Sequence, residues 1–211
     1  MKSPVDNAYL HFDESGSIPA IKNARITLGM GLPIIAARTK DSISVAAISK
    51  DNPLAEGGDK LVQVSDHCWA LITGHGGDSK QVRNMLRDLA VNHKFVFGSE
   101  ISPKEVALAL GDHLHELGMS YRRPLGAGII IVGFDVHGTV PCIYHCDVDG
   151  NVLSRHAVAL GREAGSAEHV LADGLKSGED MEACVQKAAE ATIEAMKTGS
   201  SDFTDAAFSI E

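Results

Sequence analysis

Hydrophobic positions follow two different spacings along the chain, and their order predicts the fold. Short apolar or alternating runs between turn residues predict strands, and apolar residues three and four apart predict helices. Strands are expected at 34–38, 43–48, 61–64, 68–72, 128–134, 140–146 and 152–160, with a last one near 203–210. Helices are expected at 17–28, 78–90, 102–117, 166–175 and 181–196. Groups of strands therefore alternate with pairs of helices.

This segregation of strands from helices predicts an α+β fold, since parallel βαβ arrays alternate strand by helix. Two antiparallel sheets face to face, with a helix pair on each outer side, would bury every apolar stripe. We therefore expect a four-layer α-β-β-α sandwich. No internal repeat or linker divides the 211 residues, so 1–211 is expected to be one domain.

Two helix starts carry local signals. Ser17 is a candidate N-cap ahead of Pro19, which suits the first turn of a helix. Ser102-Pro-Lys-Glu105 has the spacing of a capping box, in which the serine and the glutamate satisfy each other's backbone N–H groups. Gly118 is the expected end of the helix that this box opens.

Composition and charge exclude several classes of protein. The net charge is −9 and the pI near 5.5, whereas nucleic-acid binding requires clustered lysine and arginine. No apolar run reaches the roughly 20 residues of a membrane span. The first residues lack the basic-then-apolar layout of a signal peptide. With four cysteines that form no C-x2-C pair, these features predict a location in cytoplasm and nucleus with reduced thiols.

The cysteines and glycines offer candidate sites, but ordinary structural roles explain these residues better. Cys142 and Cys146 would share one strand face with His145 on the other, so we expect core thiols rather than a metal site or any cofactor. The Gly74-His-Gly-Gly-Asp78 segment lies between a strand and a helix, where an anion could bind, but it lacks the residues of a P-loop. A tight turn with positive φ at glycine is expected instead. Asp147-Val-Asp-Gly150 starts like a calcium loop but reads as a hairpin turn.

The local strings, in their order, resemble the α-type subunits of the proteasome core particle, a family with the N-terminal-nucleophile hydrolase fold. The resemblance covers nearly the whole chain. It rests on Asp6, Phe12, Gly16, Ile18, Ile21, Ala24, Gly31, Lys60 to Val64, Thr73-Gly74 with Asp78, Arg123-Pro-Leu-Gly126, Tyr144 to Gly150 and Ala159-Leu-Gly161. Three family positions of the N-terminal segment differ, because its Tyr, Pro and second Tyr fall on Val5, Glu14 and Asn23.

The resemblance also implies that the chain has no catalytic residue. In the catalytic β-type relatives a threonine nucleophile follows the glycine that is Gly31 here. This chain has Leu32 there, and the family's catalytic aspartate falls on Ile48. Only the lysine is kept, as Lys60, and α-type members keep it too. A side chain without oxygen or sulfur cannot attack a carbonyl, so peptidase activity by this route is excluded.

The resemblance implies instead that the chain is a structural and gating subunit of the particle that carries out ubiquitin-dependent protein degradation. The chain would lie in a heptameric ring of α-type subunits, above β-type subunits and below a regulatory particle or another activator. Residues 1–12 would form a gate-like tail, and helix 17–28 would contact neighbours. The implied sites are Asp6, Phe12 and Gly16 for the gate, Ile21, Ala24 and Leu28 for the ring interface, and Lys60 with Gly74 for an activator pocket.

Two other functions remain as alternatives. A non-catalytic β-type ring subunit would keep the fold, but the helix-forming stretch before Gly31 stands where β-type chains carry a removable propeptide. A free-standing enzyme or small-molecule binder would use His75 and Asp78 in the turn, and nothing at readable spacing supplies it with a nucleophile and a partnered base. An ordinary surface lysine is the alternative to a pocket role for Lys60.

Overall fold

The computed structural model describes residues 11–50, 60–119, 122–135, 139–199 and 208–210. Its order of elements begins with helix α1 (Pro19–Leu28), strands β1 (Ile34–Arg38), β2 (Ile43–Lys50), β3 (Leu61–Ser65) and β4 (Cys68–Gly74), and helices α2 (Gly76–Phe97) and α3 (Pro103–Met119). Strands β5 (Ala127–Phe134), β6 (Pro141–Cys146), β7 (Val152–Ser154) and β8 (Ala157–Leu160), helices α4 (Ala164–Ser177) and α5 (Met181–Gly199), and strand β9 (Phe208–Ile210) follow.

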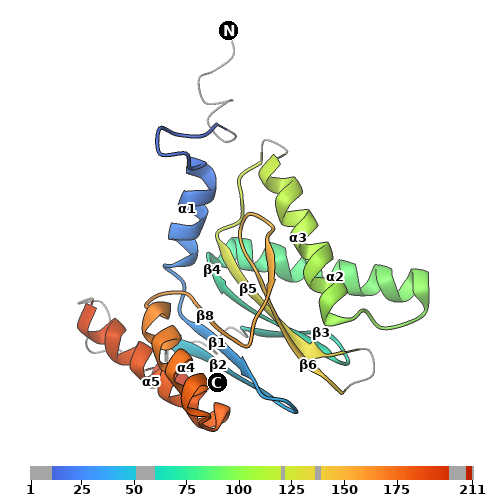
Figure 1. The fold of residues 1–211 in the computed structure, drawn as a ribbon. Helices are drawn as coiled ribbons and strands as arrows, with labels where there is room; N and C mark the ends of the chain where they lie inside the picture. Colours follow the sequence, from blue (N-terminus) through green and yellow to red (C-terminus); the bar gives the residue numbers. More distant parts are fainter. Residues whose placement is uncertain (1–10, 51–59, 120–121, 136–138, 200–207, 211) are drawn as a thin grey trace.

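The strands form two antiparallel sheets that lie between two pairs of helices (Figure 1). One sheet has the order β8-β1-β2-β9 and is covered by α4 and α5. The other has the order β3-β4-β5-β6-β7 and is covered by α2 and α3. The predicted α+β fold with two sheets between helix pairs is therefore confirmed.

Three layers of apolar side chains hold the sandwich together. Between the sheets, large aliphatic residues such as Ile34, Leu71 and Ile130 are fully buried. Under α4 and α5 the layer is rich in alanine, whereas under α2 and α3 it contains more leucine and isoleucine. Successive side chains of a strand point to opposite faces of its sheet. A strand whose residues are apolar on both faces therefore contributes to two of these layers.

One predicted strand is wrong, because residues 152–160 form two strands in different sheets. β7 pairs with β6, and β8 pairs with β1 on the other side of the sandwich. The chain crosses between the sheets at Arg155 and His156, where Arg155 N donates to Ile143 O and His156 O accepts from Arg38 N, both at 2.9 Å. At the break between β7 and β8, the N–H of Arg155 therefore binds one sheet and the C=O of His156 binds the other.

The predicted helix ends are confirmed in one case and wrong in two. Glu105 N donates to Ser102 Oγ at 3.3 Å and Ser102 N donates to Glu105 Oε2 at 3.0 Å, as in a capping box. Ser17 does not cap α1, since Ile18 precedes the helix without a side-chain cap. Gly118 lies inside α3, which runs to Met119. Of the last predicted strand, residues 203–207 lie outside the described residues, and Phe208–Ile210 is β9.

Candidate functional site

The two predicted pocket residues, Lys60 and Gly74, line one cavity of about 530 Å³. We call it the Lys60 pocket. Its walls come from the segment between α1 and β1, the end of β2, the residues around β3 and β4, and the first turns of α2. A larger cavity of about 630 Å³ lies between β2 and the start of α5 and contains neither predicted residue. The sequence thus indicates two residues that the fold brings to one place.

The ammonium of Lys60 is anchored to the backbone of two neighbouring segments. Its Nζ donates to Leu32 O at 3.1 Å and to Ile48 O at 2.5 Å. Thr73 Oγ1 donates to the same Leu32 carbonyl at 2.5 Å. Lys60 therefore joins β2 to the residues that lead into β1, and the side chains at its two partner positions are aliphatic. A hydroxyl or carboxylate that could act on a substrate is present at neither position.

Two glycines allow the backbone of this pocket to approach itself closely. Gly74 has φ +117°, and a Cβ there would lie 2.3 Å from Gly126 O. A Cβ on Gly31 would lie 2.4 Å from Gly74 N. Real Cβ atoms are essentially never that close to backbone, so glycine is required at both places. The predicted positive φ in the turn after β4 is confirmed at Gly74.

A buried carboxylate fixes the start of α2 beside the pocket. Asp78 is 4% exposed at its side chain and accepts two hydrogen bonds of 2.6 Å from the Arg123 guanidinium. Its Oδ2 also accepts from Gly126 N at 2.7 Å. The bonds from Arg123, and then the bond from Gly126, lower the pKa of Asp78 although burial raises it. His75 Nδ1 lies 3.6 Å from Asp78 Oδ1, and both Asp78 oxygens already accept hydrogen bonds from the Arg123 guanidinium.

The N-terminal helix α1 is seated on strand β5 by two more glycines. A Cβ at Gly126 would lie 2.7 Å from Thr27 Cγ2, and one at Gly128 would lie 2.9 Å from Leu28 Cδ1. Ala24, on the same helix, is 7% exposed. The sequence predicts Ile21, Ala24 and Leu28 for the ring interface. Within the subunit, Leu28 packs against β5, Ala24 is buried and Ile21 is half-buried. The exposed apolar residues of this region are Ile26 and Met30.

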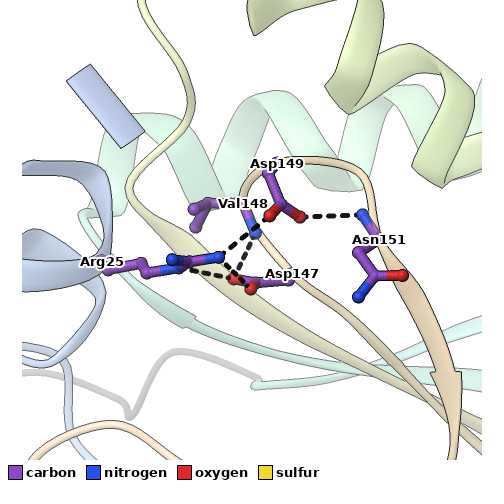
Figure 2. Close-up of polar contacts among 5 residues, drawn as sticks. All are labelled: Arg25, Asp147, Val148, Asp149 and Asn151. Atoms are coloured by element: carbon purple, nitrogen blue, oxygen red, sulfur yellow. Dashed lines mark hydrogen bonds and ion pairs between the residues drawn. The ribbon is translucent and has the colours of Figure 1, made fainter. Parts of the chain in front are cut away.

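Arg25 ties α1 to the turn between β6 and β7 (Figure 2). Its Nη2 lies 2.7 Å from Asp147 Oδ2 and 2.9 Å from Asp149 Oδ2. Burial raises the pKa of Asp147, but hydrogen bonds from Arg25 and from Val148 N outweigh it and leave that pKa below its ordinary value. The calcium-loop-like string is therefore a hairpin turn, as predicted, and its carboxylates bind arginine. Arg25 and Asp147 lie 122 positions apart, and no local pattern indicates the pair.

The segment before α1 contains a compact turn. Asp13 Oδ1 accepts from Ser15 N and Ser17 N, each at 2.9 Å, and Gly16 has φ +77°. Phe12 is 72% exposed. Of the predicted gate residues, Asp6 lies outside the described residues. This turn lies at the N-terminal end of α1 (Figure 1).

The cysteines lie where the strand pattern puts them. Cys146 and Tyr144 belong to the apolar layer under the helices, and Ile143 belongs to the layer between the sheets. Burial raises the pKa of Cys146 to about 12, which makes its thiol a poor nucleophile. Across the described ranges, no group of three or more His, Cys, Asp or Glu residues is arranged to hold a metal ion. Within the same ranges, none of the helices has the length and apolar character needed to cross a membrane.

The fold and this pocket define a class of protein: an α-β-β-α sandwich of two antiparallel sheets, with a lysine-anchored backbone cavity beside the first strand. The model of the proteasome subunit family matches residues 29–208. The chain therefore belongs to the proteasome subunit family.

Curated relatives of the chain carry α-type names. Proteasome subunit alpha type-2 of Caenorhabditis elegans is 26% identical over 161 residues, which cover 76% of this chain and 70% of that protein. A probable alpha type-5 subunit of Encephalitozoon cuniculi is 27% identical over 178 residues, covering 80% and 73%. Proteasome subunit alpha 2 of Haloferax volcanii is 27% identical over 205 residues, covering 95% and 82%. The resemblance to α-type subunits seen in the sequence is thereby confirmed.

Proposed function

We propose that the chain is a non-catalytic subunit of a proteasome α ring, at work in cytoplasm and nucleus. The observation that carries the proposal is the family match over residues 29–208 together with the α-type relatives from Caenorhabditis elegans, Encephalitozoon cuniculi and Haloferax volcanii. Leu32 and Ile48 support the non-catalytic part, since neither side chain offers an oxygen or sulfur nucleophile. In this proposal the ring is heptameric and stacks on β-type subunits.

Isolation of the chain from its own cells tests this proposal. The chain should migrate with a large particle of many subunits of similar size, and it should stay with that particle through ion exchange and gel filtration. A discrete monomer or homodimer would contradict the proposal. If the chain instead held a β-type position, a reconstruction of the particle would show it in contact with both rings of peptidase subunits.

The second part of the proposal concerns the gate. We infer that residues 1–12 project from α1 toward the axial opening and help to close it. The turn at Asp13 supports this arrangement, because it fixes the direction in which the chain enters α1. Phe12, exposed at the start of the described chain, is then available to a neighbouring tail.

Deleting Met1–Asn7 is expected to raise the basal hydrolysis of short peptides by the intact particle, because the opening loses one of its obstructing tails. Peptide hydrolysis is measured with and without a saturating activator. The activated rates of the two particles should agree, which controls for effects on the β-type sites. Equal basal rates would count against a gating role for this tail.

The third part of the proposal assigns the Lys60 pocket to activator docking. A lysine ammonium is a compact point charge suited to the terminal carboxylate of a partner chain. The first turns of α2, with their positive helix dipole, border the same cavity. Both features favour a negative group in the pocket.

A further inference from the structure

Strand β2 has an open edge over half of its length. Its inner side pairs with β1 from Ile43 to Ala47. On its outer side, within the part of the chain that the structure describes, only β9 pairs with it, and β9 reaches only residues 48–50. Residues 43–46 therefore present an open edge about 13 Å long at strand spacing. We call the cavity of about 630 Å³ that lies along this edge the β2 groove.

The hydrogen bonds between β1 and β2 show which backbone groups point into the groove. Thr39 N donates to Ser42 O at 2.9 Å. Hydrogen-bonded and non-hydrogen-bonded pairs alternate along an antiparallel ladder, so the even-numbered residues of β2 bind β1. The N–H and C=O of Ile43 and Val45 therefore point the other way, into the groove. They offer an extended chain two donors and two acceptors at the spacing of a strand.

The sequence of this edge favours pairing with another chain. Natural sheet edges are commonly blocked by proline, by lysine or by an inward-pointing charge. The run from Ile43 to Ile48 contains only isoleucine, valine, alanine and serine. Ile43 and Val45 are half-buried against the apolar layer between the sheets, so each keeps an outer flank for further apolar contact.

The opposite wall of the groove is acidic. Asp180 and Glu182, at the start of α5, line it, and its described lining contains no lysine, arginine or histidine. Both carboxylates are exposed, and neither belongs to an ion pair of the described residues, whereas the neighbouring Glu179 binds Lys187 at 2.9 Å. A cationic side chain that enters the groove would therefore meet two available carboxylates.

The two faces of an added strand would meet different surfaces, because successive side chains of a strand point to opposite faces. On one face an added residue lies beside Ile43 and Val45, at the margin of the layer between the sheets. On the other face it lies beside Ser44 and Ala46, on the side that α5 covers. The added strand is therefore expected to have apolar residues on the first face and lysine or arginine on the second.

We propose that the β2 groove binds an extended segment of a partner protein, which adds a strand to this sheet and alternates apolar with basic side chains. The main-chain groups of Ile43 and Val45 bind its backbone, and Asp180 and Glu182 bind its basic side chains. The β2 groove shares no lining residue with the Lys60 pocket, so its function is independent of activator docking there.

Labelled peptides with blocked ends test this proposal on the full chain. One peptide alternates valine with lysine, and the other alternates valine with glutamate at the same length. Binding is followed by fluorescence anisotropy at low and high salt. The lysine peptide is expected to bind about fivefold more tightly, because the glutamate peptide sets like charges against each other. The difference should shrink at high salt, since both carboxylates are exposed.

Variants of α5 then locate the effect of charge. In the Asp180→Asn, Glu182→Gln double variant the two peptides are expected to bind equally. Asparagine caps a helix as well as aspartate does, so the start of α5 is kept. Glu194→Gln is the matched control, because Glu194 is an exposed glutamate of the same helix outside the groove lining. It should leave the preference unchanged.

Methylation of the peptide backbone locates the hydrogen bonds. Only every second N–H of an added strand faces β2, and the alternation of side chains fixes which ones. Two lysine peptides are N-methylated, one at the valines and one at the lysines. One of them should bind about tenfold more weakly, because it loses its bonds to the edge, and the other should bind as before. Amide exchange of residues 43–46 should slow when the unmethylated peptide binds.

The other outcomes overturn the proposal or one of its parts. Equal binding of the lysine and glutamate peptides overturns the basic character of the partner. Equal binding of the two methylated peptides overturns the addition of a strand. If no peptide binds, or if the amides of residues 43–46 already exchange slowly in the free chain because another segment fills the groove, the proposal fails as a whole.

Discussion

Replacing Gly74 by alanine is expected to destabilise the subunit by about 2 to 6 kcal/mol, the sum of backbone strain and overpacking of about 1 to 3 kcal/mol each. The strain arises because the residue has φ +117°, which side chains other than glycine rarely adopt. The overpacking arises because the new Cβ would lie 2.3 Å from Gly126 O. Both β4 and β5 must shift to remove that contact, since Gly74 pairs with Ala127.

Thermal unfolding of the purified subunit measures this effect, and a fall in Tm on the order of 10 °C is expected for a chain of this size. If the variant does not accumulate alone, its share in the assembled particle relative to the unaltered subunit gives the same ranking. Gly118→Ala is the control, because a Cβ at Gly118 meets nothing within 4 Å and the residue lies inside helix α3. It should be neutral or slightly stabilising. Equal Tm values for the two variants would contradict the strain argument.

The layers of the fold could be predicted from the sequence because each element has a local apolar period. The capping box at Ser102 and the positive φ at Gly74 could be predicted for the same reason, since both depend on residues within a few positions. The break at Arg155 could not. Residues 152–160 contain a polar triplet at 154–156 between two apolar runs, and a polar triplet alone does not show that a strand ends; only the partners β6 and β1 decide that the two halves lie in different sheets.

The candidate site divides in the same way. Lys60 and Gly74 could be named because family strings carry them, and the fold places both at one cavity. Arg83, which lines the same cavity, carries no such signal, because on the sequence it is one polar position of an amphipathic helix. The contacts of Arg25 with Asp147 join residues 122 positions apart, which no periodicity indicates. For Ala24 and Leu28 the sequence indicates the residues but not their partner. Their helical spacing predicts an apolar face and does not say which surface covers it.

Asp78 is expected to be the residue whose loss most weakens the joint between α2, β5 and α1. Asp78→Asn removes the ion pair with Arg123 and sets an amide against donors, at a cost of about 1.5 to 3 kcal/mol, the range for a hydrogen bond to a charged group. Gly126 N, which donates to this carboxylate, belongs to the residue on which Thr27 of α1 rests. The loss is therefore expected to reach α1, seen as faster amide exchange in that helix.

The pH dependence of this loss distinguishes the charge from the shape of the side chain. The pKa of Asp78 is lowered from 3.8 in the folded protein, chiefly by the Arg123 guanidinium. Its contribution is thus complete above the unfolded value and is lost as the pH falls through the lower folded value. Urea unfolding of both proteins should give a constant difference in free energy from about pH 5 to 8, narrowing below about pH 4. Other carboxylates cancel in that difference, so a gap that stays constant down to about pH 2 would show that Asp78 acts by packing alone.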